Sequence, residues 1–236
     1  MTTNSSVLIE VRNLVKYYGS VRALDGLTLQ LEKGRVVGLL GENGCGKSTL
    51  MRILMGLNQP SSGTVSIAGH APGAETKRIV SYLPDASQMP KGVRIAYLIE
   101  HYEDFYPDFN RETCENMLAD MGIALNSKFG ELSKGQGEKV QVALTMSREA
   151  EIYLLDEPIS GVDPAARETT LRAIIQAIRP EALVIVATHL VNEIEPILDE
   201  VILMRHGNVL TSGTVDELRE RSNKSLNDYF KEVYSS

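Results

Sequence analysis

The chain is short of cysteine and of positive charge, and each shortage excludes a class of protein. Its 236 residues contain two cysteines, Cys45 and Cys114, too few and too far apart for a disulfide framework or a cysteine-based metal site, so a reducing compartment is expected. Lysine and arginine total 24 against 31 acidic residues, a formal net charge of -7. No broad basic surface is available to neutralise a phosphate backbone, so nucleic acid is not expected as a partner.

The sequence also lacks a hydrophobic run long enough to cross a bilayer. Its longest strongly apolar stretch, residues 182–191, is about half of the ~20 residues that a membrane-spanning helix needs, and Thr188 and His189 interrupt it. Residues 1–19 show no basic leader followed by an apolar core and a cleavage site, so no secretory signal is expected. We therefore expect a cytosolic chain, and any membrane that it serves would be crossed by another protein.

The hydrophobic pattern predicts an α/β fold in one compact unit. Residues 7–32 alternate apolar and polar, most clearly at residues 27–32, as a strand with one wet face does, which indicates an antiparallel sheet near the start. Continuous apolar runs, typical of parallel strands buried between helices, occur at residues 36–40, 152–156 and 183–188. The predicted core covers residues 1–90 and 151–215, with the antiparallel sheet as a β subdomain.

The other segments are predicted to form a helical insertion, a hairpin and a helical tail. Between residues 91 and 150 the pattern becomes helical with mostly polar positions, which indicates an α-helical subdomain inserted into the core. Two short apolar runs flank a His-Gly-Asn turn within residues 201–213, a pattern typical of a hairpin. Residues 216–236 are predicted to form a helical C-terminal tail.

A glycine-rich segment, GENGCGKST at residues 41–49 and here called the phosphate loop, directly follows the first apolar run. Four of its residues fit the pattern G-x-x-x-x-G-K-[ST]: Gly41, Gly46, Lys47 and Ser48. The glycines let backbone N–H groups face phosphate oxygens, the lysine adds positive charge, and the serine hydroxyl suits Mg2+. A helix predicted from residue 48 or 49 to residue 56 would add its dipole. An accidental match is the alternative, and the strand-loop-helix context disfavours it, so a nucleoside triphosphate site is predicted.

Two further motifs add candidate catalytic and phosphate-binding groups. Asp156 and Glu157 end an apolar strand, at the edge where parallel sheets bind ligands. Asp156 is therefore predicted to hold Mg2+ through water, and Glu157 to orient or deprotonate the attacking water. Ser133 and Gly135 precede a helical pattern, and a helix N-terminus there would offer a hydroxyl, free N–H groups and a dipole to an anion. The alternatives are a solvated helix start for the acidic pair and an ordinary serine N-cap for the second motif.

Together these motifs resemble the nucleotide-binding subunit of ATP-binding cassette (ABC) transporters, in that family's order along nearly the whole chain. Tyr18 stands where the family stacks an aromatic ring on adenine. The phosphate loop, the signature LSKGQ at residues 132–136, the acidic motif LLDEP and the coupling loop SGVD at residues 160–163 follow. His189 stands at the position of the family's switch histidine. The resemblance implies a P-loop NTPase sheet core, the cofactors ATP and Mg2+, and ATP hydrolysis coupled to transport.

The resemblance also assigns site residues. Catalytic roles are implied for Glu157, His189 and Lys47. The residues implied to bind ATP within the chain are Tyr18, Gly41, Asn43, Gly44, Cys45, Gly46, Lys47, Ser48 and Thr49. Those implied to bind the ATP of a second copy, in a head-to-tail dimer with two ATPs in the seam, are Ser133, Lys134, Gly135, Gln136 and Asp163. Contacts with Mg2+ are implied for Ser48, Asp85 and Asp156.

Three positions carry features that the family pattern alone does not interpret. Asp85 stands where the family has a glutamine that touches the metal and the membrane subunit, and we expect it still to approach Mg2+ while adding negative charge near the phosphates. Lys134 would add a cation near the partner's ATP, or be a solvated lysine. The helix dipole and Lys47 are expected to favour the thiolate of Cys45, although we favour the interpretation of Cys45 as a small loop residue without further consequence.

The predicted helical insertion is rich in aromatic residues. The chain has nine tyrosines and four phenylalanines, and five of these 13 residues lie within residues 97–109. The resemblance implies that this region, with the loop around Asp85, contacts an integral membrane permease, and aromatic side chains suit such an interface. A core of the small subdomain is the alternative, and the sequence leaves both open.

The predicted function is ATP hydrolysis that powers export through a separate transmembrane subunit, with amphipathic or antimicrobial peptides, drugs or lipids as candidate cargo. The chain would be peripheral on the inner face of the plasma membrane. The main alternative is a soluble ABC-type ATPase without a membrane partner, but the sequence shows no long coiled coil, second cassette or basic face. A clamp that binds ATP without turnover is disfavoured because Glu157 and His189 are both present.

Overall fold

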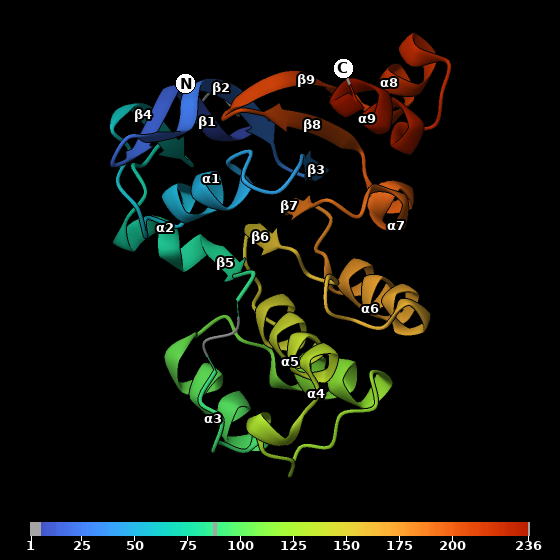
Figure 1. The fold of residues 1–236 in the computed structure, drawn as a ribbon. Helices are drawn as coiled ribbons and strands as arrows, with labels where there is room; N and C mark the ends of the chain where they lie inside the picture. Colours follow the sequence, from blue (N-terminus) through green and yellow to red (C-terminus); the bar gives the residue numbers. More distant parts are fainter. Residues whose placement is uncertain (1–5, 87–88, 236) are drawn as a thin grey trace.

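The computed structural model describes residues 6–86 and 89–235, and Figure 1 shows two sheets with helices around them. The larger sheet has six strands in the order β5-β6-β7-β3-β8-β9. Its strands are β3 (Val36–Leu40), β5 (Val80–Leu83), β6 (Ile152–Asp156), β7 (Leu183–Thr188), β8 (Glu200–Arg205) and β9 (Asn208–Thr214). Strand β9 runs antiparallel to β8, and the other pairings are parallel. The predicted α/β fold with a parallel core is confirmed.

The apolar runs form the central strands of this sheet, where other elements cover both faces. Every residue of β6 and of β7 is buried, and a strand without an alternating pattern is stable only in such a position. Strands β8 and β9 form the predicted hairpin, with His206 at φ 49 and Gly207 at φ 78 in its turn. The carboxyl ends of β3, β6 and β7 therefore meet at one edge, where a parallel sheet binds ligands.

The predicted antiparallel sheet is also present, in the order β2-β1-β4. Its strands are β1 (Val7–Tyr18), β2 (Val21–Glu32) and β4 (Ser62–Ile67). Ile9 and Leu27 of this sheet share one core with Met51 of helix α1 (Lys47–Leu54) and Leu154 of the large sheet. Helix α1 thus lies between the two sheets, which fixes the phosphate loop at its start. The helix ends earlier than predicted because Gly56 has φ 68, outside the helical region.

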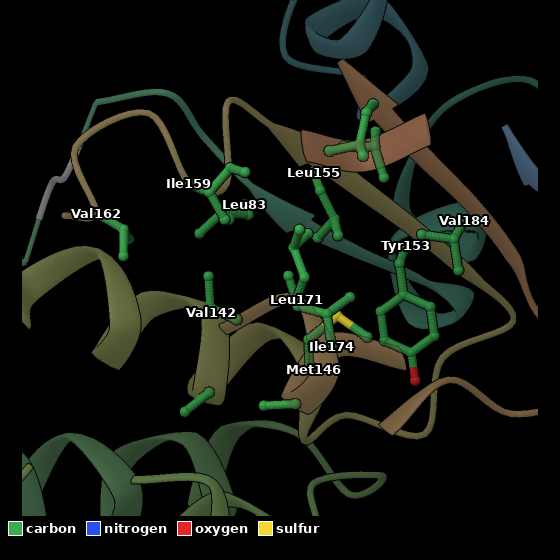
Figure 2. Close-up of a cluster of buried hydrophobic side chains, with 14 of the residues drawn as sticks. Leu83, Val142, Met146, Tyr153, Leu155, Ile159, Val162, Leu171, Ile174 and Val184 are labelled. Atoms are coloured by element: carbon green, nitrogen blue, oxygen red, sulfur yellow. The ribbon is translucent and has the colours of Figure 1, made fainter. Parts of the chain in front are cut away.

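Helices also lie on the other face of the large sheet. Helix α5 (Lys134–Met146) packs against β5 and α6 (Pro164–Ala177), and α3 (Ile95–Phe105) and α4 (Arg111–Asp120) pack against α5, with a short 3-10 helix at Phe129–Glu131. Figure 2 shows Met146 of α5, Ile174 of α6 and Tyr153 of β6 converging in one apolar cluster. The segment predicted to be helical does form helices α3, α4 and α5, whereas α6, β4 and α2 (Ala74–Ile79) were not predicted.

One arginine fastens the helical insertion to the large sheet. Arg148 is 4% exposed, and its Nε and Nη2 donate to the two carboxylate oxygens of Asp108 at 3.1 and 2.8 Å. Its Nη1 donates to the carbonyl of Val80 at 2.9 Å, and Nη2 to that of Arg78 at 2.8 Å. The guanidinium carbon lies 4.1 Å from the centroid of the Tyr106 ring. A buried cation with this many partners favours one orientation of the insertion.

The predicted helical tail consists of two helices. Helix α8 spans Val215–Ser222. Thr214 is its N-cap, with Oγ1 accepting from the N–H of Glu217 at 3.2 Å, and Asn223, which has φ 52, is its C-cap. Helix α9 (Leu226–Ser235) follows and lies beside the β8–β9 hairpin (Figure 1). A shorter helix, α7 (Val191–Ile194), follows β7. Among the helices that the structure describes, none has the length and apolar character needed to cross a membrane.

Candidate functional site

The phosphate loop joins β3 to α1 in a conformation that requires glycine. Gly46 has φ 111, and a Cβ there would lie 2.7 Å from the carbonyl oxygen of Ala23, so neither the backbone nor the space admits a side chain. Lys47 is 5% exposed, and its Nζ donates to the carbonyls of Gly41 at 2.6 Å and Glu42 at 3.1 Å. The ammonium therefore lies within the loop, where the oxygens of a bound phosphate would accept hydrogen bonds from it in place of, or beside, these two carbonyls.

A cavity of about 380 Å3 adjoins the phosphate loop and brings four segments together. It is lined by Asn43, Gly44, Gly46, Lys47, Ser48, Thr49, Asp85, Glu157, Ser160 and His189. The predicted loop residues, the catalytic candidates and Asp85 therefore converge although they lie far apart in sequence. Ser160 also lines the cavity, although it was predicted only as a member of the coupling loop. Gly41 and Cys45 are not among the lining residues.

Asp156 ends β6 beside the loop and is 1% exposed. Its Oδ1 accepts from the hydroxyl of Ser48 at 3.2 Å, whereas its Oδ2 has no hydrogen-bond partner among the described residues. The pKa of Asp156 is raised to about 6, mainly by burial; the charges of Asp85 and Glu157 contribute to this rise, whereas the Ser48 hydrogen bond and the charge of Lys47 oppose it. A buried carboxylate oxygen without a partner is unfavourable, so this side chain is suited to a bound cation.

The residues present fit Mg2+ of the kind that accompanies a nucleotide. Mg2+ usually takes one or two protein carboxylates and completes its octahedron with water and substrate phosphates. Ser48 and Asp156 offer two adjacent oxygens, and Asp85 lines the same cavity. Within the described residues no group of three or more His, Cys, Asp or Glu could hold a metal alone. The donor set therefore suits a metal whose other ligands come from the substrate.

Glu157 is held in a strained conformation at the edge of the cavity. It has φ 53, rare for a residue other than glycine. Its N–H donates to the carbonyl of Ala187 at 2.8 Å, which ties it to β7. Its Oε2 accepts from the hydroxyl of Thr188 at 2.8 Å, and its Oε1 lies 2.9 Å from Nδ1 of His189. Both carboxylate oxygens are thus oriented by the end of β7.

The sequence analysis missed Thr188, although its position carried a signal. Thr188 is fully buried and is the last residue of β7, next to the predicted switch histidine. Its Oγ1 also accepts from the N–H of Leu190 at 3.1 Å, so one hydroxyl fixes both the turn after β7 and the carboxylate of Glu157. A polar residue that ends an otherwise apolar strand beside the ligand edge was the available clue.

Tyr18, the predicted adenine-stacking residue, does not line the phosphate-loop cavity. It ends β1 with 44% of its surface exposed, and its hydroxyl accepts from Nδ2 of Asn58 at 2.6 Å. The ammonium of Lys16 lies 5.0 Å from the centroid of its ring. The ring is therefore accessible, and stacking on adenine stays a prediction.

The signature lies at the start of α5 and faces a different cavity. Ser133 is the N-cap: its Oγ accepts from the N–H of Gln136 at 3.2 Å, and its own N–H donates to Oε1 of Gln136 at 3.0 Å. Ser133 and Lys134 line a cavity of about 650 Å3 that includes Asp85 but no residue of the phosphate loop. Asp163 is exposed at the N-cap of α6. Within one chain, the residues predicted to act in trans therefore do not complete the phosphate-loop cavity.

The signature and the coupling loop are joined through one carboxylate. Oε2 of Glu138 accepts from the N–H of Gly161 at 2.7 Å, and its Oε1 lies 3.8 Å from the ammonium of Lys134. A Cβ on Gly135 would lie 2.8 Å from the carbonyl oxygen of Gly161, so the two backbones pack closely. The side chain of Lys134 is 79% exposed, which agrees with a solvated lysine that pairs with Glu138 and leaves its role toward ATP a prediction.

The expected thiolate of Cys45 is wrong for this structure. Cys45 is 7% exposed, and burial raises the pKa of its thiol despite the opposing charge of Lys47. The helix dipole and Lys47 favour the thiolate, but desolvation of the buried side chain, which does not line the phosphate-loop cavity, has the larger effect on its pKa. Its backbone remains part of the loop, so its predicted contact with ATP would be made by main-chain atoms.

The aromatic residues of the insertion divide between core and surface. A groove of about 570 Å3, here called the aromatic groove, lies between α3 and β5, with Tyr97, Phe105 and Tyr106 among its lining residues. Tyr97 and Phe105 are 60% and 69% exposed. Tyr102 packs against the hydrophobic core, and its ring centroid lies 5.7 Å from that of Phe109. The core interpretation is therefore confirmed for Tyr102 and Phe109, and contact of the exposed part with a permease stays a prediction.

Comparisons with known proteins agree with this geometry. The family model described as "ABC transporter" matches residues 24–160. The chain is 32% identical over 218 residues to the ribose import ATP-binding protein RbsA of Pseudomonas putida. The aligned region covers 86% of this chain and 42% of RbsA. It is 28% identical over 230 residues to the bacitracin transport ATP-binding protein BcrA of Bacillus licheniformis, 94% of this chain and 74% of BcrA. A solved "ATP binding subunit of ABC transporter" superposes with a TM-score of 0.84 at 27% identity, covering 96% of this chain and 99% of that one.

The sheet edge, the glycine-rich loop and the cavity define a P-loop nucleotide-binding protein with a carboxylate fixed beside the phosphate site. The matched family model spans more than half of the chain. The chain belongs to the ABC transporter family, whose ATP-binding domains bind and hydrolyse ATP. The recognition made from the motifs is confirmed.

Proposed function

We propose that this chain hydrolyses ATP to power export through a separate integral membrane permease, from a position on the cytoplasmic face of the plasma membrane. Its similarity to BcrA, a bacitracin transport protein, spans most of both chains. That similarity supports a subunit of the bacitracin transport kind, and thus a peptide, drug or lipid as cargo. A soluble ABC-type ATPase without a membrane partner is the alternative that the experiment below distinguishes.

The proposed chemistry uses the residues that line the phosphate-loop cavity. The loop N–H groups and Lys47 would bind the phosphates and neutralise the charge that develops during phosphoryl transfer. Ser48 and Asp156, with Asp85 nearby, would hold Mg2+, which supplies electrostatic stabilisation to the phosphates when bound. Glu157 would orient the attacking water and accept its proton, while Thr188 and His189 fix the carboxylate.

The proposed active assembly contains two copies arranged head to tail. Ser133 presents a helix N-terminus and a hydroxyl at a surface separate from the phosphate loop of its own chain. The triphosphate of a second copy would give that end an anion to bind. Lys134, Gly135, Gln136 and Asp163 are proposed to lie at the same contact. ATP binding would then close the dimer, and hydrolysis would let it open.

The aromatic groove is the single observation that carries the proposal of a permease partner. Tyr97 and Phe105 are large apolar side chains exposed at its edge, away from the phosphate-loop cavity. The same helix exposes Glu100, Glu103 and Asp104. An occupant that matches both features is a short amphipathic helix of the permease with an apolar stripe and basic flanks. Pro84 lines the aromatic groove and the adjacent Asp85 lines the phosphate-loop cavity.

Purification from native membranes tests the proposal. The wild-type chain is expected to be extracted with an integral membrane protein, and Phe105→Glu to lose at least about tenfold of that protein because a charge is buried against the apolar stripe. ATP binding should persist in the variant. Leu210→Glu is a matched control, since Leu210 is 47% exposed on β9 far from the groove in sequence. A wild-type chain found only in the soluble fraction would favour the alternative function, and equal recovery of the partner by Phe105→Glu would contradict the groove.

A further inference from the structure

The last helix of the described chain contacts the back of the phosphate loop through Tyr234. The hydroxyl of Tyr234 donates to the carbonyl oxygen of Met204 on β8. A Cβ on Gly41, the first glycine of the loop, would lie 2.7 Å from that same oxygen and 3.3 Å from Oη of Tyr234. Gly41, Met204 and Tyr234 therefore meet at one point. None of the three lines the phosphate-loop cavity.

Cys45 completes this support behind the loop. Its Sγ lies against Gly41, so that a Cβ there would collide with it. Its carbonyl accepts from the N–H of Gly207 at 2.9 Å, which joins the loop to the turn of the β8–β9 hairpin. The loop is thus hydrogen-bonded to the hairpin turn at Cys45, and the hydroxyl of Tyr234 lies close to the loop at Gly41.

Helix α9 holds Tyr234 in this position by several contacts of its own. Nη1 of Arg205 on β8 donates to the carbonyl of Val233 at 3.3 Å. The ring centroids of Phe230 and Tyr234 lie 4.4 Å apart, and Leu226 at the start of the helix is 1% exposed. Figure 1 shows α9 beside the hairpin. Tyr234 is therefore presented by an anchored helix.

The environment keeps the Tyr234 hydroxyl in its neutral, donating form. Burial raises the pKa of Tyr234, and the neighbouring Cys45 and Glu42 raise it further. The neutral hydroxyl can donate its proton to the oxygen of Met204. The contact does not depend on a charge.

We propose that Tyr234 is a positioning residue for ATP binding, which sets the backbone of the phosphate loop from behind through Gly41 and Cys45. The loop binds phosphate through N–H groups whose directions depend on its backbone conformation. A small displacement of such groups weakens binding strongly. The proposal rests on ATP binding by the loop and does not depend on a permease or on a dimer.

The test measures ATP affinity and the alkylation of each cysteine in the full-length chain without a partner. Tyr234→Ala removes the ring, and Tyr234→Phe removes only the hydroxyl. Glu232→Gln is the matched control on the same helix, since Glu232 pairs with Lys224 at 2.7 Å on the surface. Alkylation by N-ethylmaleimide, followed by peptide mass spectrometry, compares Cys45 with Cys114, which is 0% exposed in the helical insertion and reports general unfolding.

Tyr234→Ala is expected to weaken ATP binding about tenfold and to accelerate alkylation of Cys45 about tenfold, with Cys114 unchanged. Tyr234→Phe should shift both in the same direction by about two- to threefold, and Glu232→Gln should match the wild type. Unchanged ATP affinity in both Tyr234 variants would overturn the proposal. So would parallel exposure of Cys45 and Cys114 in both, because Tyr234 would then serve only general stability. A wild-type chain that binds no ATP would instead defeat the proposed function.

Discussion

Glu157→Gln is expected to slow ATP hydrolysis by about 10²–10⁴-fold, the contribution usual for a general base. The substitution keeps the shape of the side chain and its contacts with Thr188 and His189 but removes the acceptor for a proton. Because Glu157 lies beside the phosphates rather than within the loop, ATP affinity should change by less than about threefold. Single-turnover hydrolysis and ATP binding by fluorescence titration measure the two effects separately.

The matched control for this experiment is Glu220→Gln on α8, an exposed residue far from the cavity. Its hydrolysis rate should equal that of the wild type. Retention of more than about a tenth of the activity by Glu157→Gln would assign the base role to another group. Loss of ATP binding together with activity would show that Glu157 mainly maintains the structure of the site.

Asp156→Asn is expected to slow Mg2+-dependent hydrolysis by at least about 100-fold. The nucleotide-free variant is expected to be as stable as the wild type or more stable. The carboxylate is 1% exposed and its Oδ2 has no partner among the described residues, so its charge is unfavourable until a cation binds. Asparagine keeps the acceptor for Ser48 and removes that charge. The expected gain in the free energy of unfolding is about 0–3 kcal/mol.

Urea denaturation measures the free energy of unfolding of both proteins, first in EDTA and then with ATP and Mg2+. The wild type should gain stability from ATP and Mg2+ together, because a ligand that binds only the folded state stabilises it. The asparagine variant should lose most of the part that depends on Mg2+. Ser66→Ala, on β4 of the small sheet, serves as a control that should alter neither response. A destabilised nucleotide-free variant with normal metal dependence would contradict the assignment of Asp156.

The sequence was sufficient to predict the placement of residues at the candidate site wherever the motif also determines the backbone. The phosphate loop demands glycines with positive φ and a strand before it, so its residues and its place on the sheet edge could be inferred together. Asp156 followed from its position at the end of an apolar strand. These predictions depend on local geometry, which neighbouring residues determine.

The remaining features depend on contacts between distant segments. Thr188 orients Glu157 across 31 positions, and Tyr234 lies behind a loop that begins at Gly41. Cys45 is buried in the core that the small sheet and α1 share with the large sheet, which no local pattern reveals. Exposure likewise separates Phe105 from Phe109 only after the insertion has folded. Such packing is set by tertiary structure, so the sequence could not predict it.

The central claim of the proposed mechanism is that each chain carries two half-sites that meet only in a dimer. Sedimentation of the Glu157→Gln chain in saturating MgATP tests it most directly, because blocked hydrolysis should preserve the closed state. The proposal predicts a dimer that reverts to monomer when ATP is removed, and a monomer throughout when Ser133→Arg is added. A Glu157→Gln chain that remains monomeric with its ATP site fully occupied would contradict the claim.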